Sequence, residues 1–363
     1  MKKLRVIFFT ETEEGACAKY RAWIPCIGLD YAGHYARYST EWQPRMKNEF
    51  DVFVFQRNSV KPTINLIYSL RMQGKTVVYD LDDDLLNIPP SNPVFWAYLN
   101  NAERPWVQLQ SARWASCISV TTPQLQKLYS CVNDKVRVIP NWINIEEHKD
   151  VPPIRVAKGA LLFWGGSNTH RGCLMILKDV LPTIFKKYPH VKMVVMGDNL
   201  PFEVDWDRII QVPWGKYRFF QMIERGCDIG LAPLAPCKFN LGKSDLRIKE
   251  LAAARLPIVA SDFGEYGKAA KAARQLVAST PDDWIEALSL LIEDEQERKE
   301  RAEKAWTWAE KQDIRLHIEE TVKAYQELVE TEHFTGEEWK SVDRKEMHKF
   351  LYPPSRSGGC LSS

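Results

Sequence analysis

Residues 239–262 read FNLGKSDLRIKELAAARLPIVASD. Charged and small polar residues come first, an alanine-rich run follows, and a short β-branched segment ends the stretch. Alanine, leucine, lysine and arginine favour helices, whereas LPIVASD (256–262) has the composition of a strand buried on both faces. We therefore expect a helix over 243–255 that leads directly into a buried parallel strand, with charges gathered at its start.

The same alternation fills most of the chain. Short, almost continuously hydrophobic runs predict strands at 4–10, 51–56, 76–81, 117–122 and 136–141, and again at 159–166, 191–198, 208–213, 228–234 and 256–262. Helical patterns lie between them. Alternation of this kind favours an α/β fold with doubly wound parallel sheets.

The two series of strands predict two domains. A polar segment with two adjacent prolines, 144–154, separates them and is typical of a linker. We expect Rossmann-like domains over 1–150 and 155–310, followed over 311–363 by a helix that crosses back and a flexible tail. Ligands of open α/β sheets bind at the carboxyl ends of the strands, so a cleft between the two sheets is the expected active site.

Composition excludes several other classes of protein. The chain has 363 residues, of which 45% are hydrophobic and 26% charged, with a formal net charge of +2. That is typical of a globular protein and disfavours a general nucleic-acid binder. No apolar run reaches the roughly 18–20 residues of a spanning helix. The eight cysteines form no C-x-x-C pair and no zinc spacing, so we expect reduced thiols, no metal site and a cytoplasmic location.

Five segments, in order, resemble one enzyme family. They are GACAKYRAWIPCIGL (15–29), VVYDLDDDLLNIPPSNP (77–93), SVTTPQLQKLYS with VRVIPNWIN (119–144), LLFWGGSNTHRG (161–172), and DIGLAPL with the opening stretch (228–266). Together they resemble retaining glycosyltransferases of the GT-B fold, of the group 1 or family-4 type. The resemblance implies two Rossmann-like domains facing each other across a cleft. It also implies retaining transfer of a sugar from a nucleotide-sugar donor to a hydroxyl acceptor, without a metal or other cofactor.

The resemblance assigns donor binding to the opening stretch. On the expected helix, Lys243, Arg247 and Glu250 share one face, and its N-terminus favours the anionic diphosphate. Lys243, Ser244 and Arg247 are expected at the diphosphate and Glu250 at the ribose, where the family's second glutamate acts. The family's first glutamate would stand at Gly242, so its sugar contact passes to Asn240 or the loop backbone. The alternative is a solvated face with an Arg247–Glu250 ion pair.

Further predicted site residues follow other strands. Gly166 allows close approach of a ligand, and Ser167, His170 and Arg171 add polar and positive groups for the donor phosphate. The segments 194–198 and 212–217 are expected near the nucleoside base, where Trp214 either stacks on the base or belongs to the core.

In the first domain the resemblance places catalytic and acceptor groups. Asp82 and Asp83 follow a strand and are expected, with Glu250, to be catalytic, either by orienting or deprotonating the acceptor hydroxyl or by stabilising positive charge on the sugar. Asp84 is expected to cap the next turn. Gly15, Lys19 and Arg21 are expected in a loop that meets the donor phosphate and acceptor, unless residues 20–21 simply begin a surface helix.

Other functions remain open from the sequence. A GT-B enzyme acting on hydroxymethylated DNA bases would need a basic groove, which the near-neutral first domain disfavours. A sugar-nucleotide epimerase or an inactive binding module is compatible with the missing glutamate. Peripheral contact with a membrane is also open, although the charged helical region after residue 282 is as acidic as it is basic.

Overall fold

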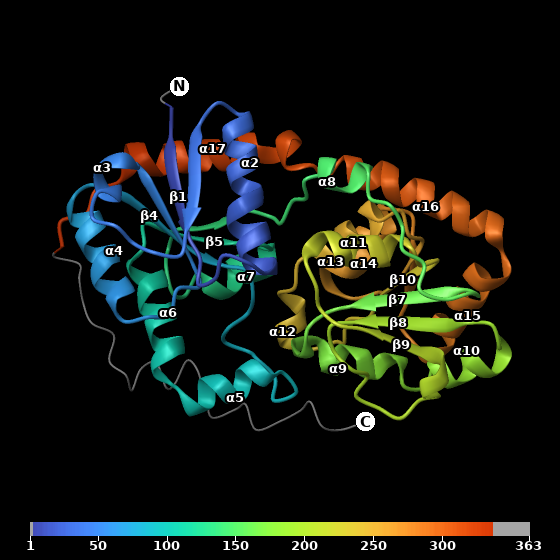
Figure 1. Cartoon of the computed structure of the whole chain (residues 1–363). Coiled ribbons are helices and arrows are strands. Elements are labelled where there is room, and N and C mark those ends of the chain that lie inside the picture. Colours follow the sequence, from blue (N-terminus) through green and yellow to red (C-terminus); the bar gives the residue numbers. More distant parts are fainter. Residues whose placement is uncertain (1–2, 337–363) are drawn as a thin grey trace. The chain divides into compact units, whose positions relative to one another are not determined.

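The chain forms two compact α/β units in a computed structural model that describes residues 3–336 (Figure 1). Within the described residues, unit 1 contains 3–89, 96–142 and 314–336; unit 2 contains Pro90–Phe95 and Ile143–Asp313. The chain therefore returns to unit 1 for its last described helix. The flexible tail expected at the end of the chain lies outside the described residues.

Unit 1 is built on a six-stranded parallel sheet in the order β2-β1-β3-β4-β5-β6. Its strands are β1 (Arg5–Phe9), β2 (Tyr35–Ser39), β3 (Val52–Gln56), β4 (Thr76–Leu81), β5 (Cys117–Val120) and β6 (Val136–Val138). In the central register Val54 pairs with Phe8 on one side and Val78 on the other. Every residue of β3, β4 and β5 is buried, as expected for strands covered by helices on both faces.

Unit 2 repeats this design with the strand order β12-β11-β10-β7-β8-β9, again parallel throughout. Its strands are β7 (Leu161–Gly165), β8 (Lys192–Met196), β9 (Ile209–Val212), β10 (Ile229–Ala232), β11 (Ile258–Ser261) and β12 (Leu276–Ala278). All ten strands expected from hydrophobic runs are confirmed. The edge strands β2 and β12 were missed, because their residues are only partly buried and lack such a run.

Helices cover both faces of each sheet (Figure 1). Up to the start of β7, the helices and helical turns are α1 (Ala16–Ala18), η1 (Lys19–Trp23), α2 (Ile24–Tyr31), α3 (Met46–Glu49), α4 (Pro62–Met72), α5 (Pro93–Asn100), α6 (Glu103–Trp114), α7 (Pro123–Tyr129) and α8 (Glu146–Lys149). Those that follow are η2 (Asn168–His170), α9 (Arg171–Leu174), η3 (Met175–Leu177), α10 (Leu181–Lys187), η4 (Trp206–Arg208), α11 (Tyr217–Arg225), α12 (Lys238–Leu241), α13 (Leu246–Ala253), α14 (Gly264–Ala272), α15 (Pro281–Glu293), α16 (Glu295–Glu310) and α17 (Ile314–Thr331).

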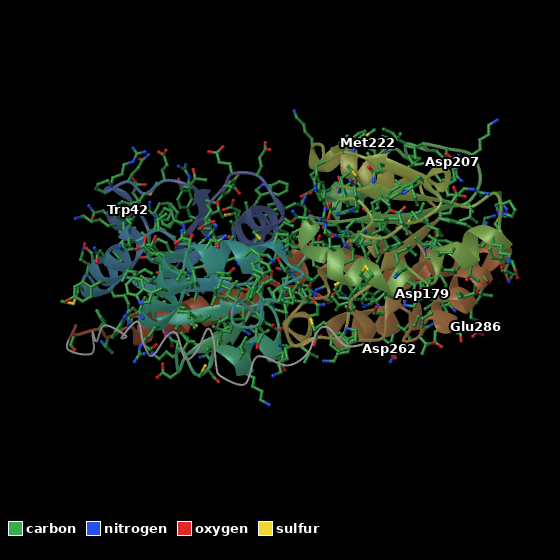
Figure 2. All side chains as sticks on the ribbon, turned by 90° about the horizontal axis from the view of Figure 1, so that it is seen from below. Trp42, Asp179, Asp207, Met222, Asp262 and Glu286 are labelled. Atoms are coloured by element: carbon green, nitrogen blue, oxygen red, sulfur yellow. The ribbon has the colours of Figure 1, made fainter. Side chains whose placement is uncertain are left out.

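Helix α15 illustrates how local sequence sets an element. The Thr280 side chain caps it by accepting a hydrogen bond from Asp283 N, and the Asp283 carboxylate accepts one from Thr280 N. Its apolar stripe, with Trp284 and Leu288 in it, packs into the core of unit 2 beside β11, β12 and α10. Charged side chains such as Glu286 on its other face are exposed (Figure 2). The sheet, and with it the carboxyl ends of its strands, is thereby held rigidly.

Candidate functional site

Three neighbouring loops meet at the carboxyl edge of the unit 2 sheet. They follow β7, β8 and β9 and are joined by backbone hydrogen bonds from Gly166 N to Met196 O (3.0 Å) and from Gly197 N to Val212 O (3.1 Å). Gly197 has φ +104°, and a Cβ there would lie 2.5 Å from Trp214 Cε2 and 2.6 Å from Gly166 O. Only glycine fits this junction, which brings the Gly166 loop and Trp214 together as predicted for donor binding.

Trp214 has one packed side and one open side. Its ring stacks on Phe220 at 5.5 Å between centroids with a 19° interplanar angle, yet 53% of the residue is exposed. It is therefore not a core residue. An exposed indole face at the carboxyl edge of a parallel sheet is a suitable surface for a flat heterocycle.

Arg171 is held at the same edge by Asp198. Its Nε and Nη2 donate to the two carboxylate oxygens at 2.8 and 3.0 Å. Partial burial pushes the pKa of Asp198 up, but the hydrogen bonds and charge of Arg171, together with a backbone bond, outweigh it, and the pKa is lowered. Arg171 remains half exposed, and the neighbouring Ser167 and Thr169 hydroxyls lie 2.8 Å apart. His170 is the last residue of the helical turn η2 and directly precedes Arg171.

The expected helix over 243–255 is wrong at its start. Helix α12 closes at Gly242, whose N–H bonds back to Phe239 O, and α13 begins only at Leu246. Lys243 and Ser244 lie in the turn between the two helices, so Lys243 does not share a helix face with Arg247. The glycine, placed where the family has its first glutamate, ends the first helix here. The Lys243 ammonium lies 4.7 Å from the centroid of the Phe239 ring.

Asn240 has a structural position. Its amide nitrogen donates to Ala235 O at 2.7 Å and lies 3.4 Å from Cys173 Sγ, and the residue is 6% exposed. It thereby fastens α12 to α9. Both bonds use the amide nitrogen, so a sugar contact by the Asn240 side chain, one of the two expectations above, would use its Oδ1 oxygen; the loop backbone is the alternative.

Arg247 and Glu250 form an ion pair of 3.2 Å on α13, and their side chains are only 16% and 11% exposed. The Arg247–Glu250 ion pair of the alternative prediction is thus present, but the two side chains are largely buried and do not form a solvated helix face. Glu224 of α11 is buried as well, with 1% of its surface exposed. Burial first, and then the charge of Glu250, raise the pKa of Glu224 to about 8 against the opposing charge of Arg247.

Sequence reasoning missed Glu224. The signal was present, because Glu224 stands four residues after Phe220 in the amphipathic helix YRFFQMIER and so falls on its buried face. A carboxylate at a core position of a helix is unusual and indicates a partner or a function. The nearby Lys249 is also buried, at 1% exposed, and pairs with Asp245 at 3.0 Å.

The carboxyl edge of unit 1 carries a second polar cluster. Arg57 bridges Asp82 and Asp83, with Nε–Oδ1 3.1 Å and Nη2–Oδ2 3.2 Å. Cys17 Sγ donates to Asp82 Oδ2 at 3.4 Å, and the Asp82 charge, with burial, raises the pKa of this thiol to about 12. The two predicted carboxylates are therefore brought together with one cation that offsets part of their charge. Asp84 caps the following turn, as expected, by accepting from Leu86 N and Asn87 N.

Arg57 is a site residue that sequence reasoning missed. It directly follows buried strand β3, beside the strand that leads to Asp82, so its position at this edge was readable from the strand order. Its backbone has φ +53°, which is rare for a residue with a Cβ, and Gln108 Nε2 holds its carbonyl at 2.9 Å. Backbone strain of this kind concentrates at functional sites.

The predicted role of Arg21 is wrong. Arg21 is 4% exposed, and its Nε and Nη2 donate to both oxygens of Asp80 at 2.9 and 2.6 Å. Nη1 donates to Ile139 O and Asn141 Oδ1. The guanidinium is built into the core of unit 1 and does not clamp a ligand, nor do residues 20–21 begin a surface helix.

The other two loop residues keep positions compatible with their prediction. Gly15 precedes α1 with φ +116°, and the Lys19 ammonium lies 4.8 Å from the centroid of the Trp23 ring. Lys19 begins the π-helical turn η1. Such turns are rare in proteins overall, and those that occur are often at functional sites.

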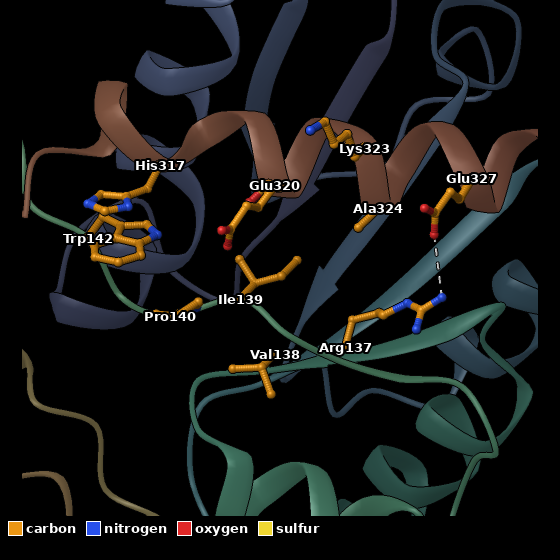
Figure 3. Close-up of a pocket in the computed structure, with 11 residues that line it drawn as sticks. Arg137, Val138, Ile139, Pro140, Trp142, His317, Glu320, Lys323, Ala324 and Glu327 are labelled. Carbon is orange, nitrogen blue, oxygen red and sulfur yellow. Dashed lines mark ion pairs between the residues drawn. The ribbon is translucent and has the colours of Figure 1, made fainter.

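A pocket of about 300 Å³ lies elsewhere in unit 1, between the segment after β6 and helix α17 (Figure 3). Trp142 and His317 stack there at 3.6 Å, and Arg137 pairs with Glu327 at 3.5 Å. None of the predicted site residues lines it. It is separate from the predicted donor and acceptor residues, so we do not assign the active site to it.

Within residues 3–336, no group of three or more histidine, cysteine, aspartate or glutamate side chains is arranged to hold a metal ion. No helix there is both long and apolar enough to cross a membrane.

Solved structures resemble this chain, although neither a protein-family model nor a curated protein sequence matches it significantly. Anabaena HepE in complex with UDP and glucose matches with a TM-score of 0.62 and 16% identity, over 88% of this chain and 100% of HepE. A glycosyltransferase from Rickettsia africae matches with 0.61 and 12%, over 91% and 100%. A UDP-forming trehalose-phosphate synthase from Burkholderia xenovorans, in complex with glucose-6-phosphate, matches with 0.53 and 14%, over 76% and 72%. The likeness establishes the fold, and the predicted GT-B class is confirmed.

Proposed function

We propose that this protein is a glycosyltransferase that moves a sugar from a nucleotide-sugar donor to a hydroxyl group, with retention and without a metal ion. The junction of Gly166, Gly197 and Trp214 carries the proposal, because it presents a glycine-lined backbone and an open aromatic face at one sheet edge. The fold is shared with HepE, whose structure was solved in complex with UDP and with UDP-glucose.

In this proposal unit 2 binds the donor. Trp214 stacks on the base, and the loop after β7 approaches the diphosphate through Gly166 and Ser167. Arg171 and Lys243 neutralise diphosphate charge by charge-assisted hydrogen bonds, and Glu250 accepts from the ribose hydroxyls. Arg171 can contact the diphosphate without leaving Asp198, because half of its side chain is exposed while Asp198 orients the rest.

The transfer step breaks the bond between the anomeric carbon and the donor phosphate oxygen and forms one from that carbon to the acceptor oxygen. The electron pair of the broken bond stays with the nucleoside diphosphate, and the acceptor proton passes to a carboxylate or to the leaving phosphate. Asp82 and Asp83 are the carboxylates we assign to the acceptor, with Arg57 holding both in place.

The test is release of nucleoside diphosphate from UDP-, GDP-, ADP- and CDP-sugars by the full chain, with and without EDTA. We expect one donor to be cleaved slowly without added acceptor, equally in EDTA. Lys243→Ala should weaken donor binding about 10- to 100-fold, the equivalent of one charge-assisted hydrogen bond. Lys186→Ala, an exposed lysine of α10, is the matched control and should change nothing.

Three results would count against the proposal. A donor whose sugar is epimerised without release of nucleoside diphosphate would indicate an epimerase. Binding without any turnover, even with a range of acceptors, would indicate a binding module. Loss of activity in EDTA with recovery in Mg²⁺ would refute metal independence.

A further inference from the structure

Arg57, which bridges the two carboxylates assigned to the acceptor, has a backbone conformation that needs support. Its φ of +53° lies in the left-handed region that favours glycine. A glycine would adopt this conformation without strain, so an arginine here indicates that its side chain is needed. The direction in which that side chain leaves the loop depends on φ. Whatever holds this backbone therefore also fixes where the guanidinium begins.

The backbone of Arg57 is held on both sides. Its N–H donates to Asp80 O of β4 at 3.1 Å, which continues the hydrogen bonding of the sheet. Its carbonyl instead accepts from Gln108 Nε2 of α6 at 2.9 Å. Gln108 is 2% exposed, and its Oε1 accepts from the Tyr98 hydroxyl at 2.6 Å. A carbonyl can only accept, so the amide nitrogen must face Arg57, which leaves the amide oxygen to Tyr98.

The next two residues of the same loop are also held by side chains. The Asn58 carbonyl accepts from the hydroxyl of Tyr79, a buried residue of β4, at 2.7 Å. Ser59 Oγ donates to Glu11 Oε1 at 2.5 Å. Side chains of α6, β4 and the loop after β1 thus fix three consecutive residues. The guanidinium is presented from a preformed loop.

We propose that Gln108 is a positioning residue of the acceptor site, acting through Arg57. The Gln108 amide holds the backbone of Arg57 in its left-handed conformation. The Arg57 guanidinium, 3.1 Å from Asp82 and 3.2 Å from Asp83, in turn holds both carboxylates where the acceptor hydroxyl meets them. Tyr98 fixes the orientation of the amide. The inference rests on the proposed function, since it takes Asp82 and Asp83 to act on the acceptor.

The test measures kcat for release of nucleoside diphosphate from the donor selected above, with water as the acceptor, and separately the Kd of that nucleoside diphosphate. Gln108→Met keeps the length of the side chain and removes its amide. We expect kcat to fall about 10- to 100-fold, because a misplacement of about 1 Å at reacting groups has an effect of this size. The Kd should stay within about twofold, since the residues assigned to the donor lie in unit 2.

Gln110→Met is the matched control. Gln110 lies on the same helix, is 3% exposed, and accepts from Trp114 Nε1 at 3.2 Å, so its replacement also removes a buried hydrogen bond. It should lower the midpoint of thermal unfolding without changing kcat. A purely structural role of Gln108 would give the same pattern in Gln108→Met.

A milder variant, Tyr98→Phe, serves if Gln108→Met does not fold. It removes only the hydroxyl that orients the amide, and it should lower kcat about two- to fivefold, the effect of roughly one hydrogen bond.

The outcomes separate the role of Gln108 from the proposed function. If the folded variant, Gln108→Met or else Tyr98→Phe, has the kcat of wild type, the role of Gln108 is refuted while the function stands. Equal losses of kcat in Gln108→Met and Gln110→Met would also refute it, because they would reflect lost stability alone. If the wild-type chain releases no nucleoside diphosphate from any donor, the proposed function itself fails.

Discussion

At the scale of single residues, the buried Arg21–Asp80 pair shows how a charge becomes part of a core. Both residues are less than 5% exposed, and Ser119 Oγ adds a third donor to Asp80 at 2.5 Å. The buried charges of Arg21 and Asp80 are tolerated because they are paired and because short hydrogen bonds satisfy both groups. The pair ties the start of the chain to β4, the strand that leads to Asp82, and to the segment after β6.

We predict that Arg21→Ala lowers the free energy of unfolding by about 3–5 kcal/mol, because it leaves the Asp80 carboxylate buried without its counter-ion. Urea denaturation measures this change. The matched control is Arg45→Ala, whose ion pair with Glu49 is 3.8 Å long and largely exposed; it should cost no more than about 0.5 kcal/mol. Equal stability of the two variants would show that the Arg21 pair contributes little.

At the scale of elements, the loops after β7, β8 and β9 act as one structure. The close approach of Trp214 and Gly166 to Gly197 makes this glycine the point where all three meet. The site therefore depends on backbone geometry that no side chain can replace.

We predict that Gly197→Ala destabilises the chain by about 1–3 kcal/mol and abolishes measurable nucleoside diphosphate binding, since the new methyl group must push Trp214 away. Gly33→Ala is the control: Gly33 also has a positive φ, +83°, but a Cβ there meets no atom within 4 Å. It should cost stability through strain alone and leave affinity unchanged. Thermal unfolding and calorimetry on both variants separate the two effects, and undiminished binding by Gly197→Ala would refute the role of the junction.

Elements of this chain differ in how far the sequence predicts them. The central strands could be predicted because burial on both faces leaves a continuous hydrophobic run, a purely local signal. The start of α13 could not be predicted, because the helix-favouring composition continues through residues 243–245, where the chain instead forms a turn after the short helix α12. The pairing of Arg21 with Asp80 spans 59 positions, and the burial of Glu224 depends on how α11 packs into unit 2. Such tertiary partners decide whether a charged residue is buried or serves a ligand, and no local pattern encodes them.

At the scale of the whole molecule, the net charge is close to zero, so attraction of a diphosphate has to come from a few local side chains. The formal net charge is only +2, so no general positive field draws an anion to either unit. Lys243, Arg171 and Arg247 are the cations of unit 2 that are predicted to contact the diphosphate. Two of them already have carboxylate partners that fix their orientation.

The most direct test of this account is a crystal structure of the full chain with a bound nucleoside diphosphate, grown in EDTA. We predict the base on Trp214, the diphosphate within hydrogen-bond distance of the Gly166 loop and of the Lys243 ammonium, and no ion between the phosphates. A diphosphate bound instead beside Trp142 and His317 in unit 1, or bound only when Mg²⁺ is supplied, would contradict it.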